Sequence, residues 1–276
     1  TRLQKFLAET GEFSRRGAEE AIREGRIRVN GKSIMDPAYR VVPMKDRVEF
    51  KGKLLRLPHK GIVLFYKPRG VVSTLSDPEG RPTVADYLTK HYRSYFPVGR
   101  LDWDSSGLMI LTNDGEVAER LMHPRYGFAR VYHARVEGKV TEGILEKVRR
   151  GVTLADGRAR GDATIISVDE KSSWLEVTVR EGRNRLVRRM FEKLRFPVMK
   201  LKRVTYGPFK VGNLKPGDIR KLTEKEYDKM RSVILKAAVQ TPEETEQAFD
   251  RDRKVKRTKP LKRPSAARGP KRRKRE

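Results

Sequence analysis

A carboxylate held in a glycine-framed loop is the clearest candidate for chemistry in this chain. Residues 99–107 read Gly-Arg-Leu-Asp-Trp-Asp-Ser-Ser-Gly and lead directly into the apolar run 108–111. Glycines permit tight turns and close backbone approach to a ligand, and a short apolar run is typical of a buried strand. Asp102 would then sit on a supported loop, where an ionised carboxylate can act as a nucleophile or a base. From spacing alone, helix capping or Asx turns by Asp102 and Asp104 are the more common use of such residues.

The elements that must position this loop belong to a strongly basic chain. Its 276 residues include 64 Lys and Arg against 36 Asp and Glu, a formal charge of +28. Such an excess favours a polyanionic partner, nucleic acid above all, through phosphate contacts and counterion release. No apolar run approaches the about 18 residues of a spanning helix, and the N-terminus lacks a signal-peptide pattern. We expect a soluble, cytoplasmic protein of about two domains, with nucleic acid rather than a membrane as its partner.

The composition gives no sign of a metal or disulfide site. Cysteine is absent, which excludes disulfides and thiolate ligands. The four histidines show no paired metal-ligand spacing: His59, His91, His123 and His133. We therefore expect no metal.

Residues 1–58 are expected to form a small domain of two helices and a hairpin. Apolar residues fall on one helical face in each of two segments: Leu3, Phe6 and Leu7, then Ala18, Ala21 and Ile22. Ser14 is a candidate N-cap for the second helix and Gly25 a candidate stop. Asn30-Gly31 is a hairpin signal. Five arginines would lie on the outside of this domain: Arg15, Arg16, Arg23, Arg26 and Arg28.

Residues 59–235 are expected to form a second domain of α+β class. Apolar and alternating runs predict strands over 62–66, 108–111, 131–136, 163–168 and 174–179. Helical patterns fall near 84–91, 116–122 and 141–150. Interspersed strands and helices indicate a mixed sheet whose strand order the pattern does not fix. Lys67-Pro68-Arg69-Gly70 predicts a turn after the first strand.

Residues 236–276 are expected to form a tail. A short acidic patch, Glu243, Glu244 and Glu246, precedes a basic run. Residues 253–276 carry 13 Lys or Arg and one acid, a charge of +12, which leaves +16 for the preceding 252 residues. With three prolines and few large apolar groups, this segment cannot bury a core, and we expect it to be disordered. It would either raise RNA affinity nonspecifically or be a solvated tail without a function.

The loop and its strand, continued through the turn Thr112-Asn113-Asp114-Gly115, resemble a known signature. This GRLD…GLLLLTNDG block is typical of the bacterial rRNA pseudouridine synthases, which include small-subunit synthase A and large-subunit synthases B, E and F. The aspartate of the block is catalytic in that family, so the resemblance implies a catalytic role for Asp102. It also implies a largely antiparallel synthase sheet and no cofactor. The domain plan is closest to the synthase B type.

Further blocks carry the same resemblance. Residues 129–136 match the family strand that bears a tyrosine after a basic residue, and residues 181–191 match its EGxxxxVRRM segment. By motif position, Tyr132 is implied to be the active-site tyrosine and Arg188 the active-site basic residue, with Arg100 as a further substrate contact. Segments up to 214–222 extend the resemblance to about residues 2–225. Three positions depart from the family pattern: Ser105, Leu186 and Ile219. Of these only Leu186, where a polar residue is usual, puts RNA contacts in doubt.

The first domain is similar to the RNA-binding domain named after the fourth protein of the small ribosomal subunit. That resemblance implies RNA contacts from Arg15, Arg16 and Lys32. On charge alone, the arginines could equally form a solvated face.

The resemblance implies isomerisation of a uridine to pseudouridine without cofactor or metal. The target base must leave its stack, and Tyr132 suits a flipped base. Asp102 would attack C1' or remove the ribose 2' proton, and Arg188 would keep the carboxylate charged and oriented. We expect large-subunit (23S) rRNA as the partner and a monomeric enzyme. Three alternatives remain: small-subunit (16S) rRNA, a tRNA substrate, and a noncatalytic rRNA-binding assembly factor, for which Asp102 would be dispensable.

Overall fold

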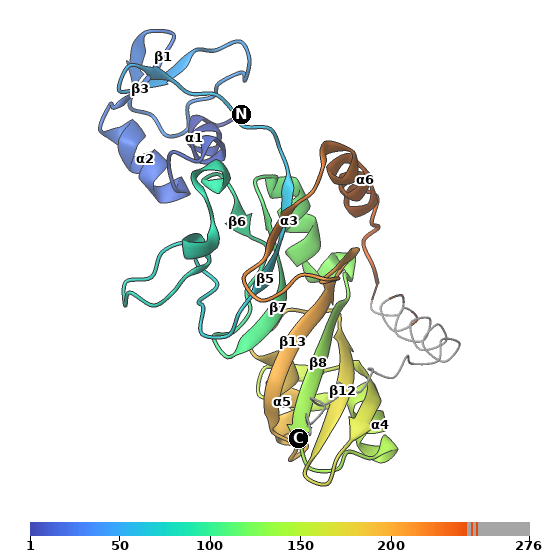
Figure 1. Cartoon of the computed structure of the whole chain (residues 1–276). Helices are drawn as coiled ribbons and strands as arrows, with labels where there is room; N and C mark the ends of the chain where they lie inside the picture. Colours follow the sequence, from blue (N-terminus) through green and yellow to red (C-terminus); the bar gives the residue numbers. More distant parts are fainter. Residues whose placement is uncertain (242–243, 245–246, 248–276) are drawn as a thin grey trace, which may run out of the picture.

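The structure is a computed structural model that describes residues 1–241, 244 and 247 (Figure 1). The predicted disorder of residues 253–276 lies outside the described residues, as do Glu243 and Glu246 of the acidic patch. Two sheets of different size divide the described chain, a four-stranded one near the N-terminus and a nine-stranded one after it. Figure 1 shows the small N-terminal domain beside one end of the larger domain.

The first domain contains the two helices and the hairpin that the sequence predicts. Its elements are α1 (Leu3–Thr10), α2 (Arg15–Arg23), β1 (Ile27–Val29), β2 (Lys32–Ile34), β3 (Val48–Phe50) and β4 (Lys53–Leu54). The Ser14 hydroxyl accepts a hydrogen bond from the Gly17 N–H, and Gly25 follows α2 with φ +67°. Asn30 and Gly31 both have positive φ, the geometry of a tight hairpin turn. These local predictions are confirmed.

The second domain is built on a mixed sheet in the order β11-β12-β8-β13-β7-β5-β15, with β14 beside β13 and β6 beside β7. Its strands are β5 (Ile62–Lys67), β6 (Phe96–Pro97), β7 (Ser105–Thr112), β8 (Arg130–Glu137), β11 (Asp162–Val168), β12 (Ser172–Val179), β13 (Val198–Tyr206), β14 (Phe209–Lys210) and β15 (Ile219–Lys221). A separate hairpin joins β9 (Val152–Leu154) to β10 (Gly157–Ala159). Among the described pairings of the large sheet, β7 with β13 is parallel and the others are antiparallel. The predicted α+β class is confirmed.

Both faces of the sheet are covered at its strands β5 and β7. The helices are α3 (Gly115–Met122), α4 (Glu142–Arg150), α5 (Leu186–Lys193) and α6 (Glu224–Leu235). Alternate residues of β5 and β7 enter a core with α4 and α5 on one face, and a core with α3 and α6 on the other. This double burial explains why these two strands are continuous apolar runs rather than alternating ones. Among the described residues, no helix is long and apolar enough to cross a membrane.

One predicted helix is wrong. The segment near 84–91 forms two 3₁₀ turns, η1 (Val84–Tyr87) and η2 (Lys90–Tyr92), separated by an extended Leu88. Thr83 and Asp86 form a capping box that is complete within the first turn. Val84 and Tyr87 lie three residues apart and pack on the core, and a 3₁₀ turn aligns side chains at that spacing. The apolar spacing therefore serves a single tight turn instead of an α-helix.

Candidate active site

The loop that carries Asp102 joins β6 to β7 and depends on its two glycines. Gly99 has φ +76° and Gly107 φ +106°, values that favour glycine. A Cβ on Gly107 would lie 2.2 Å from the backbone oxygen of Arg203, because β7 pairs here with β13. The close approach predicted for these glycines therefore occurs, at Gly107, against a neighbouring strand rather than a ligand.

A buried lysine binds the backbone of the same loop. Lys67 ends β5 and is fully buried. Its Nζ donates to the backbone oxygens of Pro68 (2.9 Å), Asp102 (3.2 Å) and Ser105 (2.9 Å). Burial lowers the pKa of Lys67 to about 8, against the opposing effect of the carboxylates Asp102 and Asp104. One ammonium thus fixes the backbone at Asp102 and three residues after it.

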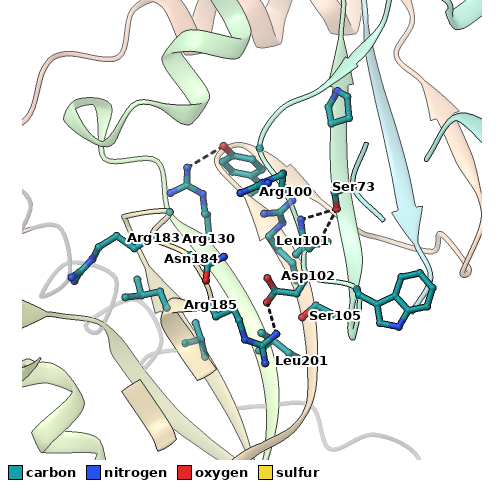
Figure 2. Close-up of a pocket in the computed structure, with 18 of the residues that line it drawn as sticks. Ser73, Arg100, Leu101, Asp102, Ser105, Arg130, Arg183, Asn184, Arg185 and Leu201 are labelled. Carbon is teal, nitrogen blue, oxygen red and sulfur yellow. Dashed lines mark hydrogen bonds and ion pairs between the residues drawn. The ribbon is translucent and has the colours of Figure 1, made fainter. Parts of the chain in front are cut away.

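Two carboxylates of the loop face two arginines of the α5 segment. Arg188 Nη2 lies 3.0 Å from Asp104 Oδ2, and Arg188 Nε lies 3.8 Å from Asp102 Oδ2. Arg185 Nη1 lies 3.8 Å from Asp102 Oδ2 and 3.5 Å from Asp104 Oδ1, and Figure 2 shows its side chain directed at Asp102. The structure brings Arg188 beside Asp102 as predicted, but its shortest ion pair is with Asp104. Arg185 is a second cation that the sequence analysis did not single out.

Arg188 is fixed by more than its ion pairs. Its Nη1 donates to the backbone oxygen of Val198 (2.9 Å), and its Nη2 donates to Ser105 Oγ (3.2 Å) and to the Asp104 backbone oxygen (3.3 Å). The residue is buried, and burial lowers the pKa of its guanidinium. Its buried Nε has no hydrogen-bond partner in the structure and is the atom nearest Asp102. The arginine is therefore held in place with one N–H turned towards the carboxylate.

Arg185 is aimed by the start of α5. It precedes the helix with φ +47°, a left-handed conformation that is uncommon for a residue with a side chain. The segment around it is tied to the turn between β9 and β10. Arg183 donates to Asp156 Oδ1 (3.1 Å), and Arg189 pairs with both oxygens of that carboxylate at 2.8 and 2.9 Å. Asp156 therefore connects the hairpin to both ends of the segment that presents Arg185.

The wall behind Asp102 is formed by β8 and β13. Tyr132 is 9% exposed, faces Arg203 across the two strands, and lines the same pocket as Asp102. The guanidinium carbons of Arg130 and Arg203 each lie 4.8 Å from the centroid of the Tyr206 ring. Arg203 Nε donates to the Leu108 backbone oxygen at 2.8 Å. These arginines give the wall a positive charge that suits a nucleic-acid phosphate or a polar base edge.

An open pocket of about 980 Å³ is lined by Asp102, Arg130, Tyr132, Arg185 and Arg203, among others. Arg100 is exposed at its rim, and Figure 2 shows it on the loop of Asp102. Leu186, the position that departs from the family pattern, is buried in the core at the start of α5 and also lines the pocket. The pocket thus combines half-buried carboxylates with several arginines and two tyrosines.

Known proteins share both the sequence and the fold of this arrangement. The family described as RNA pseudouridylate synthase matches residues 61–193, and the S4 domain matches residues 1–47. The ribosomal large subunit pseudouridine synthase B of Bacillus subtilis is 42% identical over 235 residues, which cover 84% of this chain and 96% of that protein. The chain belongs to the RNA pseudouridine synthase family. The isomerase class predicted from the sequence is confirmed.

Two further comparisons agree with this family. A synthase of the same printed name from Pseudomonas aeruginosa is 38% identical over 93% of this chain and 68% of that protein. A crystal structure of a pseudouridylate synthase has 27% identity and a TM-score of 0.58, covering 83% of this chain and 99% of that one. The synthase therefore shares its fold with a solved pseudouridylate synthase over most of the chain.

The S4 match confirms the predicted kind of N-terminal domain in this synthase. Arg15 and Arg16 are exposed in the first turn of α2, and Lys32 is exposed at the β1–β2 turn. Exposure makes these side chains accessible to RNA, and their individual contacts stay a prediction.

Sequence reasoning missed several residues that shape the pocket: Lys67, Arg130, Asp156, Arg185 and Arg203. One signal was available for Lys67, because a lysine that ends a wholly apolar run is either at the surface or buried with partners. No comparable local signal marks Asp156, which lies in a turn about 50 residues from Asp102.

Proposed function

We propose that this synthase isomerises a specific uridine of large-subunit (23S) rRNA to pseudouridine, with Asp102 as the catalytic residue. The observation that carries the proposal is the position of Asp102, half-buried in a basic pocket with Arg185 and Arg188 each 3.8 Å from its Oδ2. The relatives named large-subunit synthase B support the choice of rRNA. An rRNA substrate would also place the enzyme in the cytoplasm.

The reaction moves one bond of the nucleoside and needs no added atoms. The C1'–N1 bond breaks, the uracil turns over, and a C1'–C5 bond forms, while C5 loses a proton and N1 gains one. Asp102 acts either by attacking C1' or by removing the ribose 2' proton, and both routes require an ionised carboxylate. Arg185 and Arg188, each 3.8 Å from Oδ2, attract such a carboxylate and orient it.

The other site residues bind and orient the substrate. Tyr132 contacts the flipped base from the β8 wall, because an aromatic ring stacks on any base that has left its helix. Arg188, fixed by Val198 and Ser105, orients the Asp102 carboxylate. Arg100 at the rim contacts the RNA backbone or the flipped nucleotide. The S4 domain docks folded RNA through Arg15, Arg16 and Lys32.

The test is chemical mapping of pseudouridines in rRNA from cells that lack this protein. The strain is complemented with the wild type, with Asp102→Asn, or with Asp228→Asn, a matched change at an exposed position of α6. We expect one 23S site to disappear, and to return with the wild type and Asp228→Asn but not with Asp102→Asn.

Other results would redirect the assignment. Loss of a site in 16S rRNA would keep the chemistry and change the substrate. A site restored by Asp102→Asn would remove the catalytic role of Asp102, and an unchanged map would favour another RNA or a binding role.

A further inference from the structure

An exposed tryptophan stands directly beside the candidate catalytic residue. Trp103 is 45% exposed. Among the described Trp, Tyr and Phe residues, it and Tyr39 of the first domain are the exposed ones. The neighbours of Trp103 in the chain, Asp102 and Asp104, face the arginines of the α5 segment. The indole is thus the large apolar group that the catalytic loop leaves open to solvent.

The backbone that carries this indole is fixed on both sides. The Gly70 N–H donates to the Trp103 backbone oxygen at 2.9 Å, and the Ser105 N–H donates to the Asp102 backbone oxygen at 3.0 Å. Lys67 binds the backbone oxygens of Asp102 and Ser105 from the buried side. A ring held on an ordered backbone loses little freedom when a flat ligand stacks on it. The loop therefore holds Trp103 in a fixed position with its ring open to solvent.

The surroundings of the indole fit a nucleic acid strand. Trp103 lines the same 980 Å³ pocket as Asp102 and Tyr132. This volume lies at the upper end of the range for sites that enclose a whole small molecule, so one uracil base does not account for it. Arg100 lies in the same loop, and Arg69 precedes Gly70, whose N–H binds the Trp103 backbone oxygen; both arginines are exposed. Aromatic rings with arginines alongside are the usual platform for unpaired bases.

We propose that Trp103 stacks on an unpaired base that adjoins the target uridine in the RNA chain, while Tyr132 contacts the target itself. This inference deepens the proposed function and rests on it. Such a contact would hold the strand next to the flipped nucleotide, so that C1' is presented to Asp102. Trp103 is then a substrate-binding residue that acts on binding more than on bond cleavage.

The test uses an RNA fragment centred on the uridine that the mapping identifies, and a set of fragments in which each flanking nucleotide in turn is abasic. Rates are measured with the full-length wild type, Trp103→Phe and Trp103→Ala. We expect Trp103→Ala to lower kcat/KM on the intact fragment by about 5- to 150-fold, the range for removal of one stacked base. The loss should come mainly from KM, and Trp103→Phe should retain most of the activity.

The abasic fragments decide whether the lost contact is stacking on a neighbouring base. One abasic position should weaken the wild type as much as Trp103→Ala does, and should cost Trp103→Ala little more. Additive losses at every position would overturn the proposal, as would a Trp103→Ala enzyme as active as the wild type. Absence of product with the wild type would instead refute the proposed function.

Fluorescence gives a readout that does not depend on turnover. The chain has two tryptophans, and Trp174 lies on β12 opposite Arg135 and outside the pocket. In the full chain with Trp174→Phe and Asp102→Asn, emission comes from Trp103 alone and no substrate is consumed. The intact fragment should quench this emission, and the fragment abasic at the stacked position should bind with less quenching. Equal quenching by both fragments would overturn the proposal.

Discussion

The two sides of the active site are held in different ways. On the Asp102 side, the loop is fixed by buried backbone contacts: the Gly107 approach to β13 and two hydrogen bonds from Lys67, to the Asp102 and Ser105 oxygens. On the arginine side, α5 packs in the core, but the arginines on either side of Arg185, Arg183 and Arg189, are held by ion pairs to Asp156, a half-exposed carboxylate in a turn. Buried contacts tolerate little displacement, whereas exposed ion pairs are weak and screened by salt. The comparison predicts a rigid catalytic side and an adjustable binding side.

The largest expected effect comes from breaking the rigid side at Gly107. In Gly107→Ala, the new Cβ meets the Arg203 backbone at 2.2 Å, and φ +106° is strained for any side chain. Backbone cannot move aside as a flexible side chain can, so we expect a loss of about 3 kcal/mol or more in unfolding free energy. Urea unfolding measures it. The matched control is Gly115→Ala, where a Cβ meets nothing within 4 Å at the start of α3 and should be neutral.

A smaller effect is expected when the buried ammonium is removed. Lys67→Met keeps the volume but leaves the Pro68, Asp102 and Ser105 oxygens without their common donor. A displacement of about 1 Å in a reacting group costs about 100-fold in rate, and we expect a loss of that order in kcat. Single-turnover kinetics on the mapped fragment, with protein whose folding is verified by circular dichroism, tests this. Activity close to that of the wild type would show that the loop keeps its conformation without the Lys67 hydrogen bonds.

The same lysine predicts an alkaline limit to activity. Its pKa in the folded protein is about 8, so raising the pH through 8 removes the charge and one of its three N–H donors. We expect kcat to fall as the pH rises through that value, and the limb to be absent in Lys67→Met. Unfolding does not explain such a fall. Because the folded pKa lies below the ordinary value of 10.5, the folded state binds fewer protons between these values, and the contribution of Lys67 to stability rises with pH there.

The same contrast explains what could be predicted from the sequence. The Asp102 side is built on two runs, Ile62–Lys67 and Ser105–Thr112, whose own apolar character and glycines indicate strands and a turn directly. β13 was harder to predict from sequence, because three charged residues interrupt its apolar ones and one of them, Arg203, is nevertheless buried. The order that places β13 beside β7 is a tertiary property that no local pattern contains.

The arginine side depends on contacts that are distant in sequence. Arg188 could be proposed from its motif, but its approach to Asp104 depends on how α5 packs below β7. Asp156 and Arg189 are 33 residues apart and meet through a hairpin that the sequence analysis did not predict. A surface Asp-Gly turn has the same local signal whether or not an arginine lies opposite. Asp156 and Arg185 were therefore missed on this side, as Lys67 and Arg203 were on the Asp102 side.

The smallest expected effect comes from removing Asp156, on the adjustable side. Asp156→Ala removes the carboxylate that Arg183 and Arg189 share, and so loosens the segment that aims Arg185 at Asp102. Because exposed ion pairs contribute little, we expect kcat/KM to fall up to about fivefold at low salt, mainly through KM. The difference from the wild type should shrink as ionic strength rises, because salt already weakens the intact pairs. Asp228→Ala, exposed on α6, controls for the general loss of a negative charge. A salt-independent loss in kcat would place Asp156 on the rigid side and remove the distinction between the two sides.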